Sequence, residues 1–227
     1  MAVFNRKIRL GIIGRKDSFN KIISSINKDD KVIWMHCSSL GEYEQGLPVI
    51  KKLKEKYNSH KIVLTFLSPS GYEVKKTSSE VDLVIYLPLD SNRNAKKFIK
   101  ALHPELAVFV KNEIWPNYLK YIKKYKIKST LICGLFKKDE IKFSWPFNLI
   151  ANSVLKFDYI LVQDEESKNT IQSLGHNNIY VCGDTRFDRV YNTSNQNESI
   201  KYIDQFKSDK LCLVAGSIWK EDQIILV

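Results

Sequence analysis

The sequence has few cysteines and no long apolar run. Its four cysteines, Cys37, Cys133, Cys182 and Cys212, are far apart, and none belongs to a C-x-x-C pair. This spacing favours reduced, buried thiols in a cytosolic protein over disulfides or a zinc site. No stretch approaches the roughly eighteen apolar residues of a membrane-spanning helix, and no signal peptide is visible.

Several motifs that identify common enzymes are also missing from the sequence. It has no G-x-G-x-x-G dinucleotide fingerprint, no P-loop and no G-x-S-x-G nucleophile turn. No group of His, Cys and Asp has the spacing of metal ligands, so we expect no metal site. Internal repeats and low-complexity tracts are absent as well.

Positive charge is present in excess. The 36 basic and 25 acidic residues leave a net charge of +11 in 227 residues. Such a chain is attracted to anionic partners, which include nucleic acids, anionic membranes and phosphorylated substrates. Because the lysines are spread over many segments and no nucleic-acid-binding motif accompanies them, we favour a solvated basic surface and expect no nucleic acid partner.

Short apolar runs alternate with amphipathic stretches along most of the chain. Examples of the runs are Val32–His36, Ile62–Phe66, Leu106–Val110 and Tyr159–Val162, each followed by ten to fifteen residues or so of helical pattern. This alternation predicts βαβ units and an α/β fold, a doubly wound parallel sheet of Rossmann-like type.

The domain organisation follows from a change of composition near the end. We expect the doubly wound domain over residues 1–190 and a polar linker over residues 191–209. Residues 210–227 would then hold the first strand and turn of a second domain, with the strand at Leu211–Ala215 running into Gly216 and Ser217.

Polar residues follow the apolar runs at points where a parallel sheet binds its ligands. The segments are Ser38–Glu42, Ser68–Gly71, Asn112–Glu113 and Gly183–Arg186. Glu42 and Glu113 are carboxylates suited to deprotonate a hydroxyl and to orient a substrate, and we expect Glu42 to be a catalytic base.

Structural alternatives stay open for each of these residues. Glu42 could be an ordinary carboxylate at a helix start, and Glu113 could cap a helix beginning at Trp115. His36 fits a packed strand-end residue better than a base. Arg186 could hold an anion or form a surface salt bridge with Asp188.

Taken together, the motifs resemble those of a known family. Their order along the chain is His36–Glu42, Tyr86–Asp90, Asn112–Asn117, Gly183–Asp188 and Ala215–Trp219. In this order they are similar to the 3-deoxy-D-manno-octulosonic acid (Kdo) transferases of Gram-negative lipopolysaccharide synthesis. The resemblance extends from about Gly14 to the end of the chain.

The resemblance implies a two-domain GT-B glycosyltransferase that moves Kdo from CMP-Kdo to the lipid A precursor with inversion. The first domain would bind the acceptor and the second the donor, without a metal or other cofactor. Glu42 matches the family's catalytic base and Glu113 its second essential glutamate. The expected substrate-binding residues are Ser39, Gly41, Ser68, Ser70, Gly71, Arg186 and Ser217.

Some features depart from the family pattern. Lys111 and Asn112 stand where an acidic–Thr pair is common, and Arg186 replaces a lysine. The usual apolar N-terminal anchor and most of the donor domain are not in this sequence. We therefore expect part of a longer protein, inactive alone, that works at the cytoplasmic face of the inner membrane, bound peripherally or through an anchor outside this chain.

Two alternatives to this function remain at the level of sequence. One is a GT-B glycosyltransferase that uses another nucleotide sugar as donor. The other is a non-catalytic α/β domain that binds an anion or nucleic acid.

Overall fold

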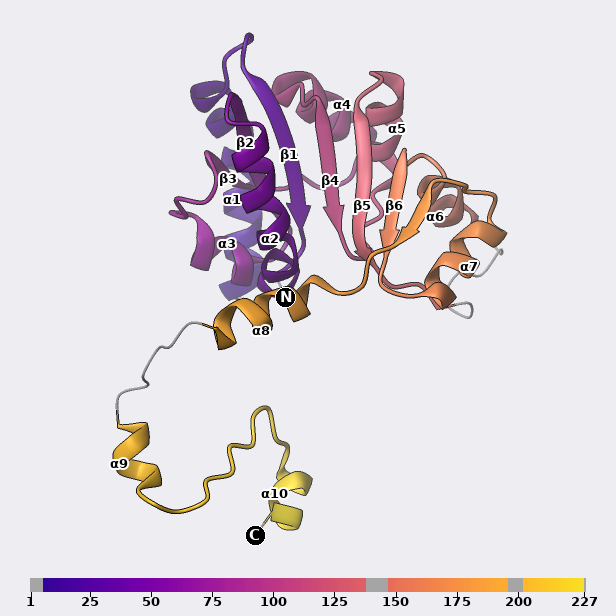
Figure 1. Cartoon of the computed structure of the whole chain (residues 1–227). Coiled ribbons are helices and arrows are strands. Elements are labelled where there is room, and N and C mark those ends of the chain that lie inside the picture. The colour runs from indigo at the N-terminus through magenta and orange to yellow at the C-terminus, as the bar shows by residue number, and fades with distance from the viewer. Residues whose placement is uncertain (1–5, 138–146, 196–201, 227) are drawn as a thin grey trace. The chain divides into compact units, whose positions relative to one another are not determined.

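The computed structural model describes residues 6–137, 147–195 and 202–226 (Figure 1). The chain divides into two compact units, and the boundary falls between Arg189 and Val190. The strands are β1 (Lys31–Cys37), β2 (His60–Phe66), β3 (Leu83–Tyr86), β4 (Leu106–Val110), β5 (Lys128–Gly134), β6 (Tyr159–Val162) and β7 (Ile179–Val181). The helices of the first unit are α1 (Arg6–Ser25), α2 (Leu40–Lys56), α3 (Pro69–Lys75), α4 (Asn92–Leu102), α5 (Pro116–Lys124), α6 (Phe147–Val154) and α7 (Glu165–Ser173), and α8 (Thr185–Ser194) begins within it.

The strands form one parallel sheet of seven strands in the order β3-β2-β1-β4-β5-β6-β7. The chain builds outward from β1 in one direction and from β4 in the other. This is the order of a doubly wound fold, with a topological switch point between β1 and β4. The fold class predicted from the sequence is confirmed.

Two layers of helices cover the sheet (Figure 1). One face packs against α4, α5, α6 and α7 through a core centred on Trp34, whose ring lies 4.9 Å from that of Phe98 and 5.0 Å from that of Phe109. The other face packs against α2 and α3 through Met35, Tyr43 and Leu64. Successive strand residues thus enter different cores, which explains why β1 is buried from Val32 to Cys37.

The second face is less covered over β5, β6 and β7. Tyr159 and Tyr180, on β6 and β7, are 46% and 54% exposed. Together with Leu106 and Leu161 they line a cavity of about 600 Å³.

Helix α1 is not among the elements predicted from the sequence. It packs on β3 and α4. Gly14 lies so close to the Tyr86 ring that a Cβ there would be 2.2 Å from it. Arg15 donates hydrogen bonds to the carbonyls of Leu67, at 2.6 Å, and Leu87, at 3.2 Å. These contacts are long-range, so a local pattern did not reveal them.

The second unit, from Val190 to Val227, contains the end of α8 and two short helices, α9 (Ile203–Lys207) and α10 (Lys220–Leu226). The strand expected at Leu211–Ala215 does not form: residues 211–216 have no regular structure, and Leu211 and Leu213 are exposed. A parallel strand needs a hydrogen-bonded neighbour, and the described residues of this unit supply none. The expected domain bounds stay a prediction.

Candidate active site

The candidate site lies where the sheet changes direction. His36 of β1 is in register with Phe109 of β4, so the two strands end side by side. The helices that follow them, α2 and α5, pack on opposite faces of the sheet. In doubly wound folds, ligands bind beyond the carboxyl ends of the strands at such a point. Glu42 follows β1 and Glu113 follows β4.

Glu42 is held by backbone groups at the start of α2. The helix begins at Leu40, because Ser39 caps it. Oε2 of Glu42 accepts hydrogen bonds from the N–H groups of Ser38 and Ser39, and the Glu42 N–H donates to Oγ of Ser39 at 3.4 Å. This is a capping box, so the structural alternative for Glu42 holds. It does not exclude a chemical role, since the carboxylate remains partly exposed.

The environment of Glu42 raises its pKa to about 7. Burial is the largest cause and the negative charge of Glu113 is the second. The hydrogen bonds from Ser38 and Ser39 and the charge of Lys111 oppose them without cancelling them. A carboxylate that titrates near neutral pH is well matched to general base catalysis.

Glu113 is held by side chains instead. Its Oε2 lies 3.2 Å from Nε2 of His36 and accepts a hydrogen bond from Nε1 of Trp115 at 2.8 Å. Its side chain is only 16% exposed. The alternative that Glu113 caps α5 does not hold, because Trp115 takes the cap position without a side-chain hydrogen bond and Glu113 turns toward His36 instead.

The pKa of Glu113 moves the other way. Burial alone would raise it, but the hydrogen bond and charge of His36, with hydrogen bonds from Ser38 and Trp115, lower it below the ordinary value of 4.5. Glu113 is therefore an anion at neutral pH while Glu42 exchanges protons there. Such a pair divides the roles of fixed charge and proton acceptor.

The turn after β2 lies next to this pair. The Ser68 N–H donates to the Ser38 carbonyl at 2.8 Å, and the hydroxyls of Ser68 and Ser70 are 2.8 Å apart. Gly71 is required by packing, because a Cβ there would lie 2.4 Å from the Phe66 ring and 3.2 Å from the backbone nitrogen of Leu40. The predicted residues therefore gather at one edge, and their contact with substrate stays a prediction.

Gly41 differs from Gly71. It is exposed, and a Cβ would meet only Oγ of Ser39, at 3.9 Å. Packing within the described residues does not require a glycine at this position. A close approach by a ligand would.

Arg186 reaches the same edge through α2. Gln45 on α2 donates to Asp184 at 3.1 Å, and the Thr185 hydroxyl donates to the Gln45 carbonyl at 2.7 Å. Arg186 pairs with Asp184, with Nε 2.8 Å from the carboxylate, whereas the sequence suggested Asp188 as the partner. Its side chain is 66% exposed and open to a ligand. Ser217 belongs to the second unit, and its role stays a prediction.

Two further residues shape the site without having been predicted to do so. Lys111 has a left-handed backbone (φ 66°) at the tip of β4, where its charge acts on Glu42. Asn112 fixes this turn through two hydrogen bonds to the backbone of Leu135. In the sequence, Asn112 was one of the polar residues that follow an apolar run, and both residues were departures from a family pattern, but neither had an expected role.

The described residues contain no cluster of three or more His, Cys, Asp or Glu side chains that could hold a metal ion. Within the same residues, no helix has the length and apolar character needed to span a membrane.

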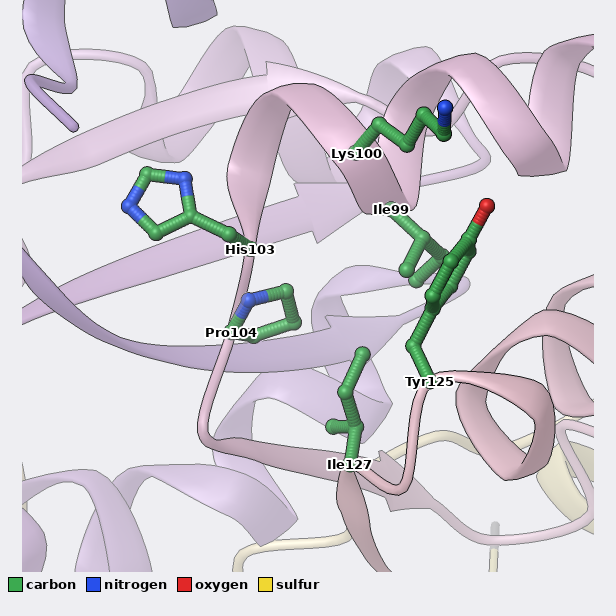
Figure 2. Close-up of a pocket in the computed structure, with 6 residues that line it drawn as sticks. All are labelled: Ile99, Lys100, His103, Pro104, Tyr125 and Ile127. Atoms are coloured by element: carbon green, nitrogen blue, oxygen red, sulfur yellow. The ribbon is translucent and has the colours of Figure 1, made fainter.

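A cavity of about 250 Å³ lies elsewhere, lined by Ile99, Lys100, His103, Pro104, Tyr125 and Ile127. Figure 2 shows the Tyr125 ring beside Ile99. Pro104 lies two residues before β4 and Ile127 directly before β5, so the cavity lies at the amino ends of the strands, opposite the glutamates. We do not assign it to the active site.

Comparison with known proteins identifies a family. The family model of the 3-deoxy-D-manno-octulosonic-acid transferases (kdotransferases) matches residues 8–189. A 3-deoxy-D-manno-octulosonic acid transferase of Aquifex aeolicus is 30% identical over 202 residues, which are 86% of this chain and 48% of that protein. The one from Chlamydophila psittaci is 27% identical over 84% of this chain and 46% of that protein. The chain thus spans about half the length of these relatives.

Solved structures support the fold. A putative UDP-N-acetylglucosamine 2-epimerase from Listeria monocytogenes has a TM-score of 0.58 at 10% identity and covers 78% of this chain and 51% of that chain. The UDP-GlcNAc 2-epimerase from Neisseria meningitidis has a TM-score of 0.55 at 15% identity, with 79% and 53% covered. At such identities the likeness concerns architecture alone.

Proposed function

The chain belongs to the family of 3-deoxy-D-manno-octulosonic-acid transferases, and we propose that it forms the acceptor-binding half of a Kdo transferase. In this proposal the enzyme is a GT-B glycosyltransferase that moves Kdo from CMP-Kdo to the lipid A precursor with inversion. No metal or other cofactor takes part.

Glu42 is the general base in the proposed reaction. It accepts the proton of an acceptor sugar hydroxyl while the hydroxyl oxygen forms a bond to the anomeric carbon of Kdo. The bond from that carbon to the phosphate oxygen of CMP breaks, and CMP leaves with the electron pair. The observation that supports this role best is a pKa of about 7 for Glu42 at the switch point of the sheet.

The remaining site residues take supporting roles. Glu113 stays ionised and orients the acceptor, next to the residue that receives the proton. Ser39, Gly41, Ser68, Ser70 and Gly71 line the acceptor side of the crevice. Arg186 and Ser217 contact the anionic donor.

The proposed location is the cytoplasmic face of the inner membrane, where the enzyme binds peripherally or through an anchor outside these residues. The net charge of +11 is consistent with an acceptor that is an anionic glycolipid. Near an anionic surface each Lys or Arg contributes about 1 kcal/mol of attraction.

The test is a transfer assay that uses the protein of natural length, labelled CMP-Kdo and the lipid A precursor. Glu42→Gln removes the base and keeps the shape of the side chain. We expect transfer to fall by about 10²- to 10⁴-fold.

Glu55→Gln is the matched control, since Glu55 is exposed and lies on the same helix, outside the site. It should leave transfer unchanged. Transfer by Glu42→Gln within a few-fold of the wild type would contradict the assignment of the base. A wild-type protein that transfers a different sugar would contradict the donor.

A further inference from the structure

His36 is a buried histidine placed directly behind the candidate site. Its side chain is fully buried and lies at the end of β1. The rings of Trp115 and Phe109 meet it edge-on, with centroids at 5.7 and 6.0 Å. A histidine in such a position could be merely a packed residue, and its polar contacts decide whether it does more.

Both ring nitrogens of His36 have partners. Nε2 lies 3.2 Å from Oε2 of Glu113, and Nδ1 lies 2.8 Å from Oγ1 of Thr65 on β2. Oε2 of Glu113 is an ionised oxygen that only accepts hydrogen bonds, so Nε2 must carry the proton in that contact.

The Thr65 hydroxyl fixes the other side of the ring. Its oxygen already accepts a hydrogen bond from Nε1 of Trp34 at 2.9 Å. Its own proton can go to Nδ1 of His36, at 2.8 Å, or to the Met35 carbonyl, at 3.4 Å, and the shorter contact favours Nδ1. Nδ1 also lies 3.2 Å from the Thr65 carbonyl, which can only accept a hydrogen bond. Nδ1 therefore accepts from the Thr65 hydroxyl when the ring is neutral and donates to Thr65 when the ring is protonated, and in both forms the proton on Nε2 faces Glu113.

The hydrogen bonds form a continuous chain from the core to the site. They run from the Trp34 indole through the Thr65 hydroxyl and the His36 ring to the Glu113 carboxylate. Trp115, in the same β4–α5 connection as Glu113, donates to the same carboxylate oxygen. The charged groups that act on the neighbouring Glu42 of α2 are Glu113 itself and Lys111 at the end of β4.

We propose that His36 is a positioning residue, which holds the Glu113 carboxylate ionised and in one orientation beside Glu42. Thr65 sets the tautomer and angle of the ring. This inference deepens the proposed function and rests on it for its chemical purpose. The positioning itself concerns only residues of the first unit.

The first test needs no variant and no substrate. In the 227-residue chain labelled with ¹⁵N at histidine, the imidazole of His36 should show a protonated Nε2 at neutral pH. Observation of the proton on Nδ1 with a bare Nε2 would overturn the proposal, because the ring could then not donate to Glu113.

The second test compares two substitutions of similar size. The amide of His36→Gln reaches about as far as Nε2 and keeps a donor near Glu113, whereas His36→Asn reaches only as far as Nδ1. We expect the carboxyl ¹³C titration of Glu113 to move to higher pH in His36→Asn and to stay close to the wild type in His36→Gln. Transfer by the protein of natural length should fall about ten- to a hundredfold in His36→Asn, with recovery in His36→Gln.

Thr65 provides a second route if the buried His36 variants fail to fold. Thr65→Ser keeps the hydroxyl and Thr65→Val removes it. Only Thr65→Val should shift the Glu113 titration and the pH profile of transfer. Folded His36→Asn and Thr65→Val variants with an unchanged Glu113 titration would overturn the proposal. Altered titrations in a protein that transfers no Kdo would leave the positioning intact and contradict the proposed function instead.

Discussion

The two strand connections at the switch point each carry a glutamate, and the two glutamates have different hydrogen-bond partners and opposite pKa shifts. After β1, Glu42 turns back on its own helix and is bound by backbone N–H groups of Ser38 and Ser39. After β4, Glu113 turns into the core and is bound by the side chains of His36 and Trp115. The same residue type at neighbouring strand ends therefore acquires a raised pKa in one case and a lowered pKa in the other.

The difference shows that the hydrogen bond donors around each glutamate, together with the order in which the two ionise, set the direction of each pKa shift. Glu113 has side-chain donors that outweigh its burial, so it ionises first. Its charge then makes ionisation of Glu42 harder. The charge of Glu113 thus raises the pKa of Glu42, the proposed base.

The largest effect should come from breaking this relation with Glu113→Gln. Removing the fixed charge should lower the pKa of Glu42 below about 7, although burial still holds it above 4.5. Loss of an organised charge at the site should slow transfer by about 10²-fold or more. Carboxyl NMR and the transfer assay measure the two effects, and a Glu42 titration unchanged by the substitution would contradict the coupling.

Within the first connection, the two glycines should respond differently to an added methyl group. Gly71→Ala forces a Cβ against the Phe66 ring and should lower the free energy of unfolding by about 1–3 kcal/mol. Gly41→Ala has open space and should change it by less than about 0.5 kcal/mol. Urea denaturation compares the two. If Gly41→Ala folds normally but loses acceptor binding, a ligand must occupy that space.

The stability of the protein should depend on pH in opposite directions through the two glutamates. Because the folded pKa of Glu42 is raised, its contribution to stability is present below the unfolded value of 4.5 and is lost as pH rises through about 7. The folded pKa of Glu113 is lowered, so its contribution is present above 4.5 and is lost as pH falls below that value.

Unfolding free energies of the wild type, Glu42→Gln and Glu113→Gln at several pH values measure these contributions. The advantage of the wild type over Glu42→Gln should shrink from about pH 5 to about pH 8. Its advantage over Glu113→Gln should shrink only in acid. Parallel curves for the two variants would show that the environments of the glutamates do not differ.

Lys111→Ala should have the smallest effect. The positive charge of Lys111 is the weakest of the influences on Glu42 and favours its ionised form. Its removal should raise the titration midpoint of Glu42 slightly, in the opposite direction to Glu113→Gln. A midpoint that does not move, or that moves down, would contradict an action of the Lys111 charge on Glu42.

Much of the fold could be predicted because its signals are local. The strands at Leu106–Val110 and Tyr159–Val162 begin and end where the apolar runs do. Burial on both faces of a parallel sheet produces such runs, whatever the rest of the chain does. Helix α1 was not predicted, because its position depends on Tyr86 and on two distant carbonyls to which Arg15 donates hydrogen bonds.

The placement of the candidate residues Glu42 and Glu113 at one edge of the sheet could be predicted from the sequence, but their electrostatics could not. That Glu42 and Glu113 gather at one edge follows from strand order. The partner of Glu113 is a histidine 77 residues earlier in the chain, so only the folded register of β1 and β4 shows that the glutamate turns inward. The strand expected at Leu211–Ala215 shows the opposite error, since an apolar run forms no strand without a neighbour.

The central claim is that the two glutamates ionise in separate pH ranges, and a carboxyl ¹³C titration of the wild-type chain tests it most directly. The account predicts a midpoint near 7 for Glu42 and a midpoint below 4.5 for Glu113. Midpoints that both lie near 4.5, or the higher value on Glu113, would contradict it.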